Sequence, residues 1–306
     1  MRKLVLLATL LAIPLVTFAQ DTVPEAPKQG WTKAGNISLL FSQASFSDEW
    51  KGGGTSNIAG NLTGSFDMNY RQGRLTWDNR IMADYGLTKL KDQEFSRKTN
   101  DRLELNSLVG RQTGGGTSWY YSYFMNFKTQ FTSGYEFSED TNGDEVRTET
   151  TKFLSPGYLQ TGPGMLWKKS DDLKVNIAPA SARLIFVSDV FTNVGSVQTA
   201  IDAFNADGGY FGVEANKTTR FEFGASLGAY YKTKVVKNVI LENILTLYSN
   251  YLEDPQNVDI DYTLNLIMTI NKFITANVAF QAIYDDNAVQ ATQVREAIGV
   301  GVTYGF

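Results

Sequence analysis

The chain has 306 residues, of which 13% are aromatic, and it contains neither cysteine nor histidine. Without cysteine, a disulfide framework and a lipid anchor on cysteine are both excluded. The formal net charge of −4 at pH 7 argues against nucleic-acid binding. Beyond the amino-terminal stretch, no segment approaches the roughly 18 consecutive apolar residues of a membrane helix.

The first twenty residues have the pattern of a secretory signal peptide. Arg2 and Lys3 form a basic start, a short apolar stretch follows, and small residues surround Ala19. The apolar stretch is too short to cross the roughly 30 Å of hydrocarbon, which favours a cleaved signal over a transmembrane anchor. Residues 21–35 are then expected to form a short periplasmic tether, and residues 36–306 a single folded domain.

From residue 36 onward, apolar and polar residues alternate in twelve segments. A period of two is typical of a strand with two different faces, whereas a helix would spread the same residues around its whole circumference. Each segment is long enough for the roughly 9–11 residues of a tilted membrane-crossing strand. The expected strands are 36–46, 57–71, 74–88, 101–111, 118–131, 157–168, 173–186, 218–232, 238–251, 257–271, 273–285 and 295–306.

The connections between these segments are alternately long and short, except that 252–256 is shorter than this scheme requires. Outer-membrane barrels pair short periplasmic turns with longer external loops. The sequence therefore predicts an all-β fold, an antiparallel transmembrane up-and-down β-barrel of about twelve strands with both termini periplasmic.

Aromatic residues are predicted on the outward faces near both ends of the strands. Along the tilted strands, Trp77 and Tyr85 are roughly 19 Å apart, and Trp119 and Phe131 roughly 28 Å apart. These separations bracket the ~25 Å apolar band of an outer-membrane barrel, as two interfacial girdles would.

The last segment, REAIGVGVTYGF, alternates up to the carboxyl-terminal Phe306. A strand of this kind resembles the assembly signal of bacterial outer-membrane proteins. It implies an outer-membrane location among lipid and lipopolysaccharide, and contact with the barrel-assembly machinery through Phe306. The inward residues Gly299, Gly301 and Thr303 are small, as is Ser38 on the first strand. Any open channel is therefore expected beside the seam between these two strands.

The absence of histidine bears on catalysis. The outer-membrane phospholipases, lipid A deacylases and omptin-type proteases depend on histidine as a base, and histidine is also the usual metal ligand. A Ser–Lys or paired-carboxylate mechanism stays open. The expectation is a protein without enzymatic activity, cofactor or metal site.

Charged residues of both signs are predicted on the inward faces. They have two interpretations: the lining of a narrow aqueous pore that screens small polar solutes, or mutually neutralising pairs that fill the interior. For individual residues the second is favoured. The candidate lumen residues are Asp67, Arg74, Asp78, Arg80, Asp84, Arg102, Glu104, Lys128, Arg220, Glu222 and Glu242.

Two external loops stand out by length. Loop 132–156 is acidic around DTNGDE, which has part of a calcium-loop pattern but lacks the full ligand spacing, so a solvated loop is preferred. Loop 187–217 contains a segment in which Val197, Ile201 and Phe204 have helical spacing. This helix is expected either to fold inward as a constriction or plug, or to lie on the rim as a lid.

The segments 153–187 and 208–227, together with the opening 36–54, resemble a Bacteroidota outer-membrane β-barrel family of unknown function. The shared motifs are glycines, prolines and aromatic residues at turns and strand ends. Between the two longer motifs, residues 194–206 exceed the family's pattern. The resemblance implies the fold and the membrane, and it provides no catalytic or binding residue to transfer.

Three functions follow from the sequence. The first is a narrow, porin-like passive channel for small polar solutes. The second is a non-conducting structural or accessory subunit of an outer-membrane complex, with partner proteins unknown. The third, least favoured, is a lipid-modifying enzyme.

Overall fold

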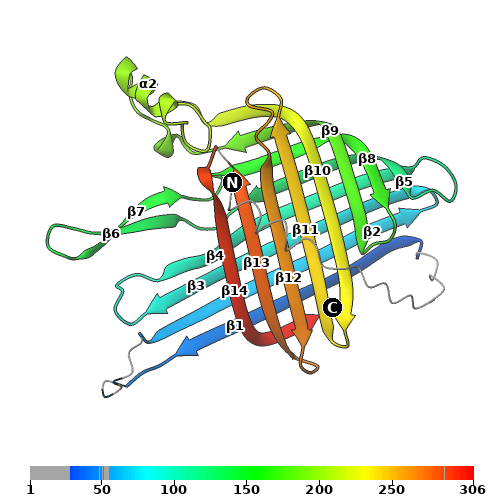
Figure 1. Ribbon diagram of the computed structural model, residues 1–306, viewed down its shortest axis with the longest axis horizontal. Helices are drawn as coiled ribbons and strands as arrows, with labels where there is room; N and C mark the ends of the chain where they lie inside the picture. Colours follow the sequence, from blue (N-terminus) through cyan, green and yellow to red (C-terminus); the bar gives the residue numbers. More distant parts are fainter. Residues whose placement is uncertain (1–27, 48, 50, 52–54, 286) are drawn as a thin grey trace, which may run out of the picture.

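The computed structural model describes residues 28–47, 49, 51, 55–285 and 287–306. Twelve strands in these residues close into an antiparallel β-barrel, which confirms the predicted fold class (Figure 1). The predicted signal peptide, 1–20, and the beginning of the tether lie outside the described residues. None of the described helices is long and apolar enough to cross a membrane.

Strands that are neighbours in the chain are also neighbours in the barrel, except that β8 pairs directly with β5. The two strands between them form a separate hairpin, β6 (Gly134–Glu139) with β7 (Glu145–Thr151). The barrel strands are β1 (Gly30–Ala44), β2 (Asn57–Gln72), β3 (Leu75–Leu90), β4 (Arg97–Gln112), β5 (Trp119–Thr129), β8 (Gly157–Lys168), β9 (Leu173–Phe186), β10 (Thr219–Val236), β11 (Val239–Asn250), β12 (Asp259–Thr269), β13 (Ile274–Asp285) and β14 (Val289–Gly305).

The expected strand bounds agree with the structure to within a few residues, with three corrections. β1 begins at Gly30, so residues 30–35 belong to the barrel and not to the tether. β14 begins at Val289, six residues before the expected 295. The region 132–156 was expected to be a loop throughout, but it contains the β6–β7 hairpin.

The two faces of the strands differ as the alternation predicts. On β1, Leu39 is 59% exposed on the outer surface, whereas its neighbour Ser38 is 4% exposed inside. Ile298 and Val294 on β14 are likewise exposed on the outer surface, at 66% and 62%. The barrel therefore presents apolar side chains outward and keeps polar ones inside, the reverse of a water-soluble domain.

One row of aromatic residues crosses three neighbouring strands. Trp31 pairs in register with Tyr70, and Tyr70 with Trp77. The ring centroids of Trp31 lie 5.0 Å from Tyr70 and 5.6 Å from Trp77. Tyr70 and Trp77 belong to the aromatic set expected from the sequence, whereas Trp31 was missed because it precedes the expected start of the first strand.

The connections divide the barrel into two ends. At the turn end lie the short connections 73–74, 113–118, 169–172, 237–238 and 270–273. At the loop end lie 45–56, 91–96, 130–156, 187–218, 251–258 and 286–288. The predicted alternation of long and short connections holds for most of the chain, but the last loop, expected at 286–294, spans only 286–288 and is shorter than the turn 113–118. β1 starts and β14 finishes at the turn end.

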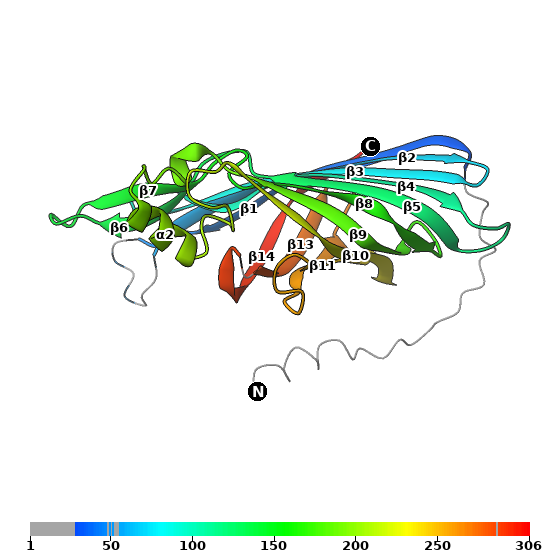
Figure 2. The same cartoon turned by 90° about the horizontal axis from the view of Figure 1, so that it is seen from above.

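The long connection 187–218 contains the short 3-10 helix η1 (Asp189–Phe191) and the helix α2 (Gln198–Ala206), as the spacing predicted. Figures 1 and 2 show α2 beyond the strand ends, beside the β6–β7 hairpin, so it is not a plug inside the barrel. Tyr210 fastens this connection to the hairpin: it stacks on Phe191 and its hydroxyl donates a hydrogen bond to the carbonyl of Thr150.

The barrel has two walls whose strands cross steeply. In Figure 1 the strands β2 to β5 run close to horizontal, and β10 to β14 run close to vertical in front of them. As a consequence β1 and β14, which close the ring, run together only near the carboxyl terminus and then diverge.

Candidate functional site

The middle of the barrel is bridged by Arg80 of β3. Its guanidinium contacts the carboxylate of Asp67 at 2.7 Å and, on the other side, that of Glu242 at 3.1 Å. The hydroxyl of Tyr230 donates a hydrogen bond to Glu242 at 2.7 Å and accepts one from Arg80 at 3.2 Å. Because β3 and β11 are six strands apart in a ring of twelve, the contact between Arg80 and Glu242 joins opposite walls through the interior.

A second bridge lies toward the loop end. Lys128 of β5 contacts Asp261 of β12 at 2.6 Å, and these strands are five positions apart in the ring. Beside it, Arg102 contacts Asp84 at 2.5 Å and Glu104 at 3.6 Å. Asp261 and Asp84 are thus each paired with a cation of another strand, and Glu104 with a cation of its own strand.

A third group closes the turn end around Asp78. Its carboxylate contacts Arg71 at 2.6 Å, Lys168 at 2.8 Å and Lys174 at 3.1 Å, so that β2, β3, β8 and β9 meet on one side chain. Arg71 and Lys168 also contact Asp171 in the 169–172 turn. Burial raises the pKa of Asp171, but the two cations lower it more, so that the net pKa is below its usual value.

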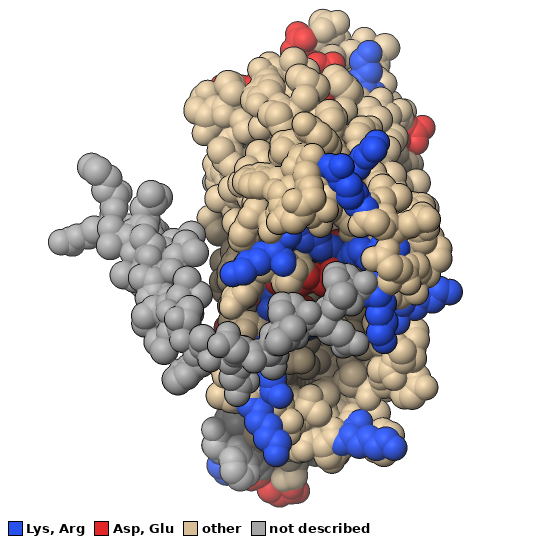
Figure 3. Space-filling view, turned by 90° about the vertical axis from the view of Figure 1, so that its right-hand side faces the viewer, with Lys and Arg blue, Asp and Glu red and all other residues tan. Residues whose placement is uncertain are grey.

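The rim of this end is basic. Figure 3 faces it and shows Lys and Arg side chains around a hollow, with acidic side chains between them. The exposed basic residues of the turn end include Lys28, Lys33, Arg74, Arg111, Lys169, Lys234, Lys237 and Lys272.

At the loop end, Glu222 of β10 is fully buried between two guanidinium groups. Arg183 contacts it at 2.6 Å and Arg220 at 2.9 Å. The same Arg183 contacts Asp259 at 2.5 Å, and Arg220 contacts Glu253 at 2.5 Å. The charges of this layer therefore form one continuous chain from β9 across β10 to β12 and the 251–258 loop.

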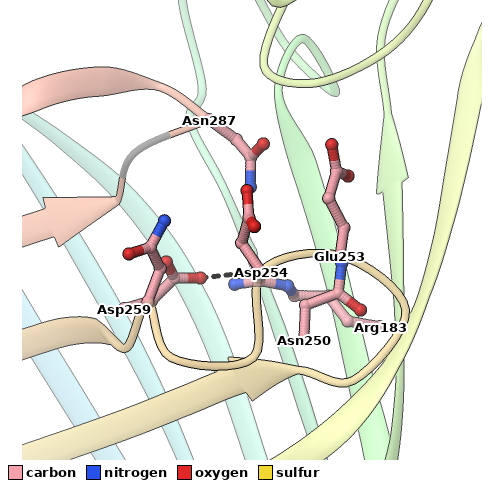
Figure 4. Close-up of a pocket in the computed structure, with 7 residues that line it drawn as sticks. Arg183, Asn250, Glu253, Asp254, Asp259 and Asn287 are labelled. Atoms are coloured by element: carbon pink, nitrogen blue, oxygen red, sulfur yellow. Dashed lines mark hydrogen bonds and ion pairs between the residues drawn. The ribbon is translucent and has the colours of Figure 1, made fainter.

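A small pocket opens above this chain of charges. Figure 4 shows Arg183, Asp259, Glu253 and Asp254 around it, with the ion pair between Arg183 and Asp259 at its base. Its volume of about 30 Å³ is large enough for water but too small for a larger ligand. A wider hollow of about 610 Å³ adjoins it between the long connection and the mouth of the barrel. The described residues contain no group of acidic side chains arranged to hold a metal ion.

The acidic DTNGDE segment forms the tip of the β6–β7 hairpin. The carboxylate of Asp140 accepts hydrogen bonds from the N–H groups of Asn142, at 2.8 Å, and Asp144, at 2.9 Å. The N–H groups of Asp144 and Asn142 lower the pKa of Asp140. Its oxygen atoms thus cap the turn of the hairpin.

The structure brings together most of the residues singled out from the sequence. Arg74 differs from the others: it is exposed and donates hydrogen bonds to the backbone carbonyl of Gln112 at 2.7 and 3.1 Å. Sequence reasoning overlooked several members, although they lie on the same inward faces of their strands. The candidates found in interior ion pairs are Asp67, Asp78, Arg80, Asp84, Arg102, Glu104, Lys128, Arg220, Glu222 and Glu242; those overlooked are Arg71, Lys168, Lys174, Arg183, Asp259 and Asp261.

The paired part of the seam between β1 and β14 is closely packed. The hydroxyl groups of Ser38 and Thr303 lie 2.7 Å apart, and Thr303 lies 2.7 Å from Thr275 on β13. The Leu40 side chain covers Gly299: a Cβ at this position would lie 3.0 Å from the Cβ of Leu40. The small size of these residues thus allows the three strands to pack closely; a channel beside them stays a prediction.

Comparisons with known proteins give little information on activity. Residues 41–135 match the model of a family described as a protein of unknown function (DUF3078). This match overlaps the opening segment of the resemblance noted above and covers less than half of the chain. No curated protein matches the sequence.

Solved structures similar to this chain are outer-membrane barrels at low identity. The translocator domain of the autotransporter NalP from Neisseria meningitidis has 10% identity and a TM-score of 0.40, with 92% of this chain and 90% of that chain covered. The COG4313 outer membrane channel from Pseudomonas putida F1 has 11% identity and a TM-score of 0.38, over 94% and 98%. Outer membrane phospholipase A from Escherichia coli has 11% identity and a TM-score of 0.34, over 93% and 94%. These likenesses are too distant to support an argument about activity.

Proposed function

We propose that this protein is an outer-membrane β-barrel. Its closed sheet leaves no free edge along most of the ring, its outer surface is apolar, and an aromatic row crosses β1, β2 and β3 at the turn end. Exposing such an apolar surface to water would cost free energy, whereas in a bilayer the surface lies against hydrocarbon. The turn end is then the periplasmic side.

We infer further that the barrel does not conduct at rest and acts as a structural or accessory component of the membrane. The observation that carries this is the contact of Arg80 with Glu242 between opposite walls. An ion or solute passing along the axis would have to displace this pair, and then the Lys128–Asp261 pair. Separating buried charges in this way is expensive unless each finds a new partner.

A second candidate is the narrow passive channel. What favours it is the polar interior, together with the hollow and basic rim at the turn end in Figure 3. Under this candidate the cross-barrel pairs would exchange partners with passing ions.

Conductance in planar lipid bilayers separates the two candidates. The purified, refolded protein is expected to give no steps above those of a protein-free bilayer. The variant in which Arg80, Glu242, Lys128 and Asp261 are all replaced by Ala is expected to give measurable steps, since it removes both cross-barrel pairs. Steady conductance of the unaltered protein would overturn the closed-barrel proposal and establish the channel.

Assembly is proposed to depend on the last residue. The backbone of Phe306 exchanges two hydrogen bonds with Gly35, at 2.8 and 3.0 Å, and its ring stacks near Tyr304 and Phe66. Contact with the barrel-assembly machinery, and with lipid and lipopolysaccharide around the barrel, is part of this proposal. Phe306→Ala is expected to lower the amount of folded barrel recovered from outer membranes, and an undiminished yield would contradict that role.

A further inference from the structure

Over part of its length, β14 has a partner on one side only. β13 pairs with it from Val289 to Val302, whereas β1 pairs with it only from Val300 onward. The final residues of β1, 42–44, pair with β2 and with no residue of β14. Among the described residues the two strands thus enclose a wedge that opens toward the loop end, visible as their divergence in Figure 1.

The outer edges of the wedge are mostly apolar, with the exposed Glu296 between two apolar residues on the β14 side. Leu39 and Phe41 are exposed on the β1 side, and Val294 and Ile298 on the β14 side. In a bilayer these side chains would face hydrocarbon on both sides of the opening. The sheet edge between them carries backbone N–H and C=O groups that are costly to leave unpaired in lipid, so the wedge requires an occupant with polar groups as well as apolar ones.

The inner side of the wedge carries a cation without a counter-charge. Arg295 of β14 points inward, and its recorded polar contact is a 3.5 Å hydrogen bond to the side-chain oxygen of Gln281 on β13. Among the described residues, no carboxylate lies within ion-pair distance of Arg295. By contrast, an ion pair is formed by each of the interior arginines Arg71, Arg80, Arg102, Arg183 and Arg220.

The carboxylates that attract Arg295 from a distance already form ion pairs with other cations. Asp84 and Asp261 act on it electrostatically, but Asp84 is bound to Arg102 and Asp261 to Lys128. Glu296, the next residue along β14, points to the opposite face of the strand. The guanidinium therefore remains an uncompensated positive charge inside the opening.

We propose that the wedge binds an anionic amphiphile, a lipid whose phosphate or carboxylate head pairs with Arg295. Its acyl chains would stay in the bilayer along the exposed apolar edges of β1 and β14. The small residues Ala297 and Gly299 leave the approach to Arg295 open, and Leu40 forms its floor over Gly299. This inference rests on the proposed function, because it requires that the barrel lies in a membrane.

A lipid fits the wedge better than a protein strand does. A strand added by a partner or a second copy would satisfy the backbone edge of β14, but it would leave Arg295 without a counter-charge. An anionic head supplies that charge in a charge-assisted hydrogen bond, and its ester and glycerol oxygens supply acceptors for the backbone N–H groups. Charge complementarity thus selects the lipid.

The test uses the full-length folded protein in phosphatidylcholine nanodiscs that contain spin-labelled phosphatidylglycerol as a minor component. The protein is expected to immobilise this lipid in preference to spin-labelled phosphatidylcholine. Arg295→Gln is expected to weaken the preference about tenfold. Glu296→Gln is the matched control on the neighbouring residue and should leave the preference unchanged. An equal preference in the Arg295→Gln variant and the unaltered protein would overturn the proposal.

A cysteine staple provides an independent test, because the chain has no cysteine of its own. If the pairing of β1 with β14 were extended, Ala44 would lie opposite Ala297, so Ala44→Cys with Ala297→Cys can close the wedge. Oxidation should abolish the phosphatidylglycerol preference, and reduction should restore it. A preference that persists in the oxidised form would place the lipid elsewhere and overturn the proposal.

Two further outcomes are informative. Displacement of the labelled lipid by inorganic phosphate alone would show that the site binds simple anions, and this result would overturn the proposal of an amphiphile. A doubled mass in native mass spectrometry that is lost on stapling would show that a second copy occupies the edge. The proposed function fails separately, if the protein does not enter the bilayer at all; insertion without lipid preference contradicts the present inference alone.

Discussion

The two sides of β14 differ in how far they are paired with a neighbouring strand. Toward β13 the ladder is regular from Gln293 to Val302 and continues past a register shift to Val289, whereas toward β1 it is confined to the turn end. Interior charges follow the same division: Arg80, Lys128 and Arg183 each contact a carboxylate, and Arg295 at the open side does not. The interior is thus neutralised by ion pairs between neighbouring strands and between opposite walls, and this compensation ends where the ring is incomplete.

The largest effect is expected from breaking the paired wall at Glu222. Glu222→Ala would leave Arg183 and Arg220 with only their second carboxylates, in a site where Glu222 is 0% exposed. The loss of unfolding free energy is expected to be about 3–5 kcal/mol. Equilibrium unfolding in urea from lipid vesicles measures it.

The control for this experiment lies on the open side. Glu296→Ala removes an exposed carboxylate that has no recorded ion pair, so its effect is expected to stay within about 0.5 kcal/mol. Equal losses in the two variants would contradict the difference between the paired wall and the open side.

A smaller effect is expected at the paired part of the seam. Thr303→Val removes a hydroxyl that contacts both Ser38 and Thr275 at 2.7 Å. The loss is expected to be about 1–2 kcal/mol, because two hydrogen bonds disappear and the remaining hydroxyls lose a partner. Thr292→Val, on the part of β14 without a β1 partner, serves as the control and should be close to neutral in the same unfolding measurement.

The alternation of residues predicted the twelve strands well, since one face of each strand had to be apolar and the other polar. It failed at Gly30 to Gly35, because this segment has little alternation. The inward faces could also be predicted, which is why most charged members of the interior were named correctly. Their partners could not: Arg80 and Glu242 are 162 positions apart in the sequence, and they meet only because the walls cross closely. The incomplete seam depends on the same crossing.

At the loop end, the attachment of the hairpin can be weakened without touching the barrel. Burial raises the pKa of Tyr210 to about 12, so its hydroxyl stays protonated and donates to the Thr150 carbonyl at neutral pH. Tyr210→Phe is expected to cost about 1 kcal/mol locally and to speed amide exchange in β7, with little effect on β14. Hydrogen-exchange mass spectrometry checks this, and unchanged exchange in β7 would contradict the attachment.

The smallest effect is expected from acid on the hairpin. Hydrogen bonding from the N–H of Phe95, followed by that from Arg97, lowers the pKa of Glu145 below its usual value. In the unfolded chain a glutamate has a pKa of about 4, and in the folded hairpin the pKa of Glu145 is lower. The ionised Glu145 therefore stabilises the folded hairpin above about pH 4, and this stabilisation is lost as the pH falls through the folded-state pKa. Exchange in β6 and β7 is therefore expected to rise below about pH 4, and Glu145→Gln should remove this dependence. A hairpin equally protected at acid and neutral pH would contradict the role of Glu145.

The central claim is that opposite walls of the barrel meet through Arg80 and Glu242. A double-mutant cycle of Arg80→Gln and Glu242→Gln, measured by unfolding in lipid vesicles, tests it most directly. Contact predicts a coupling energy of about 1–3 kcal/mol between the two substitutions. Effects that add to within about 0.5 kcal/mol, as for residues on opposite sides of an open channel, would contradict it.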